Sequence, residues 1–94
     1  KNEALGKQIF ERIQAMLINE AVDAVFWQVA NAKDIDLAMQ YGTNYPKGLL
    51  AWCDEIGANK PLTILENLYQ TYGEDRYRPS SLLRKMAKEN ALFF

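Results

Sequence analysis

Histidine is absent from this 94-residue sequence. Its absence removes the commonest general acid or base of enzymes and the commonest protein ligand of transition metals. No cluster of other residues has the spacing of a metal site, so we expect no bound metal. The single cysteine, Cys53, cannot form an internal disulfide, which is typical of a reducing cytoplasm. Because Cys53 follows a tryptophan on an apolar segment without a cationic neighbour, it is predicted to be a buried structural thiol.

An excess of charge of either sign is also lacking, since 11 Lys and Arg residues face 12 Asp and Glu residues. The basic residues are scattered, so we expect no nucleic-acid partner. Charged residues interrupt the longest apolar segment, which argues against a transmembrane helix. The first ten residues lack the basic start and apolar core of a signal peptide. These absences predict a cytoplasmic protein without a membrane or nucleic-acid partner.

Helix breakers are missing from residues Gln8–Ala30, which contain neither Gly nor Pro. In the first half of this segment, Ile9, Ile13, Met16 and Leu17 recur at helical spacing. The second half is apolar on most of its circumference. A helix of this kind needs neighbours on most sides, so the segment is predicted to be the central helix of a bundle. It carries more apolar surface than a chain this small easily covers, which indicates a partner.

No stretch alternates as a strand would, and the turn residues divide the remaining chain into four shorter helices. The second helix is predicted to be capped by Asn31 and to end at Gly42. The others are predicted at Leu49–Ile56 before Gly57, from a cap at Asn59 to Gly73, and at Ser81–Glu89 after a cap at Ser80. The sequence therefore predicts an all-α fold, a five-helix bundle built on one long N-terminal helix, with residues 1–94 as a single helical domain.

Glu20, Asp23 and Trp27 share one face of the long helix. Two interpretations are open: a carboxylate pair that acts on a substrate, or a hydrated stripe beside an interfacial tryptophan. The second is favoured, because acid–base pairs normally need a cleft that shifts their pKa values. Asn19 lies near this stripe and is expected to form hydrogen bonds across helices.

The segment from Thr43 to Gly48 is the most distinctive loop. Pro46 holds Tyr45 extended, and Gly48 allows either a close backbone approach or unusual dihedral angles. A phosphate-binding loop is not indicated, because the glycines follow no strand. From these residues alone, a rigid connector and a binding loop remain equally open.

Three segments carry a family resemblance: INEAVDA (18–24), KDIDLAMQYGTNYPKG (33–48) and DRYRPSSLLRKM (75–86). Between the last two stands a W-x-D-x-x-G pattern made by Trp52, Asp54 and Gly57. In this order and spacing, the chain resembles the C-terminal domain of the NAD-dependent 3-hydroxyacyl-CoA dehydrogenases, from about Gly6 to Asn90. The resemblance implies an all-helical fold like the C-terminal domain of 6-phosphogluconate dehydrogenase.

The resemblance also implies partners. In that family, a preceding Rossmann domain binds NAD and carries the catalytic His–Glu pair, the acyl-CoA substrate lies between the domains, and the helical domain forms the homodimer. By this likeness, the substrate-binding residues of our chain are Asn44, Tyr45, Pro46 and Gly48. No catalytic residue and no cofactor-binding residue is expected within the chain itself.

At two positions the sequence differs from the pattern of that family. Glu11 stands where the family's first helix has an asparagine at the catalytic site, and Leu49 replaces the proline that usually follows the loop glycine. The chain is therefore similar to the second helical copy of tandem bacterial enzymes of the phenylacetate and 3-hydroxybutyryl-CoA pathways. We expect a fragment of a longer enzyme that is inactive alone. A purely structural dimerisation module and a stand-alone adaptor that binds an amphipathic helix are the alternatives.

Overall fold

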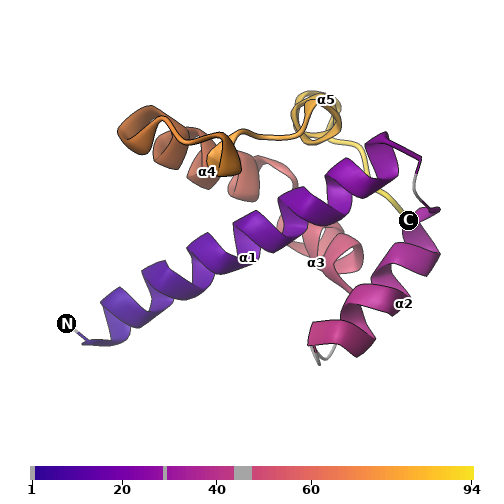
Figure 1. The fold of residues 1–94 in the computed structure, drawn as a ribbon, viewed down its shortest axis with the longest axis horizontal. Coiled ribbons are helices and arrows are strands. Elements are labelled where there is room, and N and C mark those ends of the chain that lie inside the picture. Colours follow the sequence, from indigo (N-terminus) through magenta and orange to yellow (C-terminus); the bar gives the residue numbers. More distant parts are fainter. Residues whose placement is uncertain (1, 29, 44–47) are drawn as a thin grey trace.

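The computed structural model describes residues 2–28, 30–43 and 48–94 (Figure 1). Within these ranges the chain forms five α-helices, one short 3-10 helix and no strand. The prediction of an all-α fold built on a long N-terminal helix is confirmed. The elements are α1 (Asn2–Phe26), α2 (Ala32–Thr43), α3 (Leu49–Ile56), α4 (Asn59–Tyr72), η1 (Asp75–Tyr77) and α5 (Ser81–Glu89).

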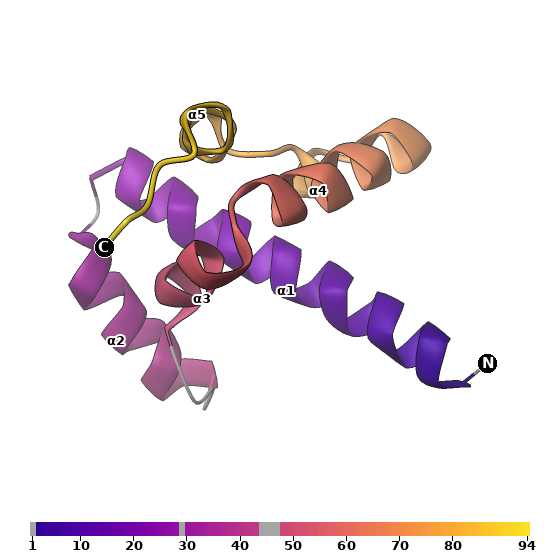
Figure 2. The same cartoon turned by 180° about the vertical axis from the view of Figure 1, so that it is seen from behind.

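Helix α1 is the axis of the molecule and contacts each of the other four α-helices. It crosses between α4 and α5 on one side and α2 and α3 on the other, and its N-terminal half extends beyond α2 and α3 but lies alongside α4 (Figures 1 and 2). Its 25 residues span about 37 Å at a rise of about 1.5 Å per residue. No helix in the described ranges is long and apolar enough to cross a membrane.

The predicted ends of the long helix, Gln8 and Ala30, are both wrong. The helix already begins at Asn2, because Gly6 lies in open space and a glycine there weakens a helix without ending it. It ends at Phe26, because Gln28 adopts a left-handed conformation (φ 59°) that stops the helical hydrogen bonding.

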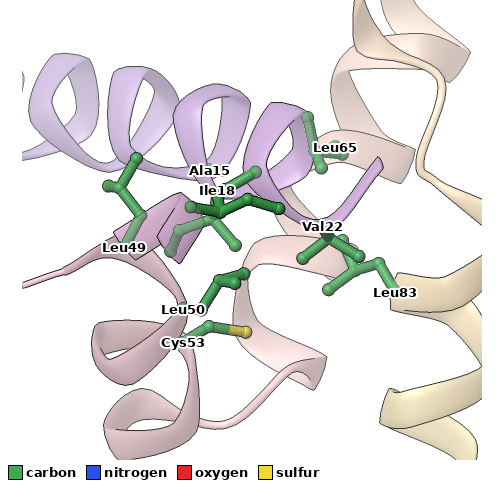
Figure 3. Close-up of a cluster of buried hydrophobic side chains, with 10 residues drawn as sticks. Ala15, Ile18, Val22, Leu49, Leu50, Cys53, Leu65 and Leu83 are labelled. Atoms are coloured by element: carbon green, nitrogen blue, oxygen red, sulfur yellow. The ribbon is translucent and has the colours of Figure 1, made fainter. Parts of the chain in front are cut away.

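The core is formed where the middle of α1 meets α3, α4 and α5 (Figure 3). Side chains spaced three and four residues apart on one face of α1 supply its centre, and leucines from the other helices surround them. The fully buried members drawn in Figure 3 are Ala15, Ile18, Val22, Leu49, Leu50, Cys53, Leu65 and Leu83. Burying such side chains is the main favourable term in the stability of a domain this small.

The apolar stripe predicted for the first half of α1 is divided, because Met16 and Leu17 pack against this core and the other two residues do not. Ile9 and Ile13 are 49% and 48% exposed, whereas Ile18 is fully buried. Helix α1 therefore carries two apolar faces. The other helices bury the inner face, which lies mainly in the second half of α1, and leave the other face exposed. We call the exposed side chains Leu5, Ile9 and Ile13 the outer face of α1.

Local capping explains several helix ends. The Asn31 side chain accepts a hydrogen bond from the Asp34 backbone N–H at 2.9 Å, and the Ser80 hydroxyl accepts one from Leu82 at 3.3 Å, so both predicted caps are confirmed. Gly57 and Gly73 follow α3 and α4 with φ values of 88° and 67°, as predicted for residues that close a helix.

Two capping predictions are wrong. Helix α2 continues through Gly42 to Thr43, so this glycine does not end it. Asn59 is the first residue of α4 and does not precede it. Its side-chain amide donates to the Ala87 carbonyl oxygen at 3.4 Å, so it ties α4 to α5.

Candidate functional site

The four residues expected to bind substrate fall into two groups. Asn44, Tyr45 and Pro46 lie outside the described residues. Gly48 is described, is buried, and stands directly before α3. The surroundings of Gly48 therefore show how this end of the loop is fixed.

Asp36 of α2 holds the start of α3. Its side chain is buried, Oδ1 accepts a hydrogen bond from the Leu50 N–H at 2.7 Å, and Oδ2 accepts one from the Ala51 N–H at 2.9 Å. The first N–H groups of a helix have no partner within it, and the N-terminal end of a helix favours negative charge. One carboxylate thus caps a helix from a neighbouring helix, and the two hydrogen bonds offset the cost of its burial.

Gly48 is required by this arrangement. A Cβ atom at this position would overlap the Asp36 carboxylate, although the backbone angles of Gly48 (φ −68°, ψ 151°) are open to any residue. Of the two reasons predicted for Gly48, the close approach is confirmed and the unusual dihedral angles are not, and the approaching group is Asp36. Sequence reasoning missed Asp36, for which the only signal is an acidic residue directly after the buried Ile35.

Glu11, at which the resemblance predicts an asparagine, forms an ion pair. Its Oε2 lies 3.2 Å from Nζ of Lys60 on α4. The pair lies between two surface hollows along the α1–α4 contact, of about 260 Å³ and about 530 Å³, and Glu11 and Ile64 line both. Glu11 is therefore engaged with α4.

The polar face of the second half of α1 faces the segment before α5. The Asn19 amide donates to the Arg78 carbonyl oxygen at 2.9 Å, and its side-chain oxygen accepts from the Ser80 N–H at 2.7 Å. The predicted hydrogen bonding of Asn19 across elements is confirmed. Beside it, Glu20, Asp23 and Trp27 line one hollow of about 500 Å³ together with residues from 75–81.

The apolar end of the chain is held by Asp54 of α3. Its two carboxylate oxygens accept hydrogen bonds from the backbone N–H groups of Phe93 and Phe94, at 2.8 and 2.9 Å. The Phe93 side chain packs against the core. Asp54 therefore fastens the segment after α5 to α3.

Cys53 is buried, as predicted. Burial, together with the nearby carboxylates of Asp54 and Asp36, raises the pKa of its thiol to about 12. A thiol in this state is a poor nucleophile, because the thiolate is the reactive form. Among the described residues, no group of three or more His, Cys, Asp and Glu side chains could hold a metal ion.

We predict that Cys53 reacts with Ellman's reagent at pH 8 at least about 100-fold more slowly in the folded protein than in urea, because the folded thiol is both covered and protonated. The release of the coloured thiolate product measures both rates. Equal rates would contradict the burial of Cys53.

Comparisons with known proteins give the chain its family. Residues 9–92 match the family described as 3-hydroxyacyl-CoA dehydrogenase, C-terminal domain. The chain is 55% identical over 76 residues to the 3-hydroxyadipyl-CoA dehydrogenase of Escherichia coli K12, covering 81% of this chain and 16% of that protein. It is 43% identical over 84 residues to a probable 3-hydroxybutyryl-CoA dehydrogenase of Deinococcus radiodurans, covering 89% of this chain and 30% of that protein.

A solved structure agrees with these matches. The crystal structure of 3-hydroxybutyryl-CoA dehydrogenase from Escherichia coli K12 superposes with a TM-score of 0.79 at 54% identity, over 83% of this chain and 16% of that one. The chain thus spans between a sixth and a third of the length of these relatives.

Proposed function

We propose that this chain, which belongs to the 3-hydroxyacyl-CoA dehydrogenase C-terminal domain family, shapes the acyl-CoA cleft and the dimer interface of such an enzyme. The observation that carries the proposal is the family match over residues 9–92. The whole enzyme would transfer a hydride between NAD and the 3-hydroxyl group of an acyl-CoA. NAD would bind to a Rossmann domain of the same protein.

The cleft role is assigned to Asn44, Tyr45, Pro46 and Gly48. The contact between the helices on either side of this segment supports the role. Asp36 joins α2, which precedes this segment, to α3, which follows it. Two helices fixed to each other in this way hold Gly48 at a defined position, which supports a role for this residue in the cleft.

The interface role is assigned to the outer face of α1. Leu5, Ile9 and Ile13 leave apolar area exposed along the N-terminal half of α1. Exposed apolar side chains gathered on one face mark interaction sites in soluble proteins. We assign this face to a second helical domain, from a dimer partner or from a tandem copy in the same protein.

A place as the second of two tandem copies is supported by two observations. Identity is higher to the longer relative, of which the chain covers 16%, than to the shorter one, of which it covers 30%. In addition, Glu11 stands in the asparagine position and pairs with Lys60.

Kinetics of the longer enzyme test the cleft role. We expect Tyr45→Ala to raise the KM for acetoacetyl-CoA at least about fivefold, because a side chain in the cleft contributes about 1 kcal/mol or more to substrate binding. Tyr72→Ala removes the same side chain from the last turn of α4 and is expected to leave KM unchanged. The 94-residue chain alone is expected to show no turnover of acetoacetyl-CoA with NADH.

A structural module without ligand contact is the second candidate, and the engaged Glu11 favours it. In that case, Tyr45→Ala would leave KM and kcat unchanged. Turnover by the purified chain alone would contradict both candidates.

A further inference from the structure

The hollow beside the second half of α1 has an exposed aromatic wall. Trp27 is 69% exposed, and the Phe26 ring meets it edge-on with ring centroids 5.2 Å apart. The hollow has a volume of about 500 Å³, and the segment 75–81 forms its opposite side. None of the residues that line it belongs to the proposed cleft loop or to the outer face of α1.

The charges in this hollow are not balanced. Each of its two arginines forms an ion pair with an acidic residue of its own segment. Arg76 Nε lies 2.8 Å from Glu74 Oε1, and Arg78 Nη2 lies 3.4 Å from Asp75 Oδ1. The carboxylates of Glu20 and Asp23 line the α1 side, and neither forms an ion pair or side-chain hydrogen bond with any residue that the structure describes. The hollow therefore presents two uncompensated negative charges next to an exposed indole ring.

This combination fits a guanidinium group. Arginine is planar, stacks on aromatic faces and forms forked hydrogen bonds with carboxylates, whereas an ammonium group is a compact and strongly hydrated charge. The same chemistry already operates at the rim, where the Arg76 guanidinium lies 4.7 Å from the centre of the Tyr77 ring. We propose that this hollow docks an arginine side chain presented by a partner protein, between the Trp27 ring and the Glu20 and Asp23 carboxylates.

A protein segment is favoured over a free small cation. Phe26 and Trp27 are both exposed, and exposed aromatic residues around a charged anchor are typical of protein–protein interfaces. The residues flanking the arginine would cover these two side chains. The proposal goes beyond the dehydrogenase function and does not depend on it.

NMR titration of the ¹⁵N-labelled protein tests the proposal. The probe is the peptide acetyl-Leu-Arg-Leu-amide, and we expect the indole N–H signal of Trp27 to shift saturably with a Kd on the order of millimolar. The Trp52 indole, which is half-buried, serves as the internal control. The same peptide with citrulline, the neutral isostere of arginine, is expected to bind at least about tenfold more weakly, because it lacks the positive charge.

Variants assign the binding to the two carboxylates. The double change Glu20→Gln and Asp23→Asn is expected to weaken binding at least about tenfold without loss of folding, because these side chains form no ion pair or side-chain hydrogen bond with the part of the chain that the structure describes. Glu66→Gln removes an exposed acid of α4 and is expected to leave the Kd unchanged. Equal binding of the citrulline peptide, or equal effects of the two sets of variants, would overturn the proposal. Tighter binding of free L-arginine than of the peptide would also overturn it, because that result would indicate a small-molecule site.

Discussion

Replacing Ile18 with alanine is expected to lower the free energy of unfolding by about 2–5 kcal/mol. Ile18 is fully buried at the centre of the core, where α1 meets leucines from α3, α4 and α5 (Figure 3). The truncation removes apolar contacts and leaves a cavity that close-packed neighbours fill only in part. Urea denaturation followed by far-UV circular dichroism measures the change.

Ile9→Ala is the matched control, because it removes the same atoms from the same helix. Ile9 lies on the outer face of α1 and is 49% exposed, so we expect a loss below about 1 kcal/mol in a dilute monomer. A loss as large as that of Ile18→Ala would contradict the assignment of the two faces. If the outer face forms the interface, Ile9→Ala will also weaken self-association, which sedimentation equilibrium detects separately.

The two faces of α1 mark a limit of sequence reasoning. The long helix and its stripe of Ile9, Ile13, Met16 and Leu17 follow from spacing alone. Which apolar face lies inward depends on the neighbouring helices, and α1 is apolar on both sides in its second half. Spacing within one helix carries no information on this choice.

Helix ends were predictable where one local interaction decides them. The bounds of α3 and α5 agree with the prediction, because Gly57 ends α3 and the Ser80 hydroxyl caps α5. The start and end of α1 were not predictable, because no strong cap stands at either end. A glycine does not end a helix by itself, as Gly6 within α1 shows.

In the candidate site, too, only the local feature was predictable from the sequence. The sequence predicts a close approach or unusual dihedral angles at Gly48, because glycine has no Cβ atom. It does not identify the group that approaches. Asp36 bonds to backbone N–H groups 14 and 15 residues further along the chain, and backbone groups leave no trace in a sequence pattern. From the sequence alone, a single acidic residue on an amphipathic helix is therefore expected to be exposed to solvent.

Gly48→Ala is expected to destabilise the protein by about 1–3 kcal/mol, because the added methyl group must displace the buried Asp36 carboxylate or shift the start of α3. The backbone angles of Gly48 suit alanine, so the loss reports the overlap alone. Gly6→Ala is the matched control. Gly6 lies inside α1 with nothing near its missing Cβ, so alanine there should stabilise the protein by about 0.5–1 kcal/mol. The sign of the effect thus separates a glycine needed for space from one that only weakens a helix.

A double-mutant cycle identifies Asp36 as the cause. Asp36→Ala alone is expected to cost about 1–3 kcal/mol, because it leaves the N–H groups of Leu50 and Ala51 without their acceptor. Once the carboxylate is gone, Gly48→Ala should add little further loss, so the two changes should couple by about 1 kcal/mol or more. Additive losses, measured by urea denaturation of all four proteins, would show that the methyl group meets something else. Coupling would establish that this carboxylate both caps α3 and excludes every residue but glycine at position 48.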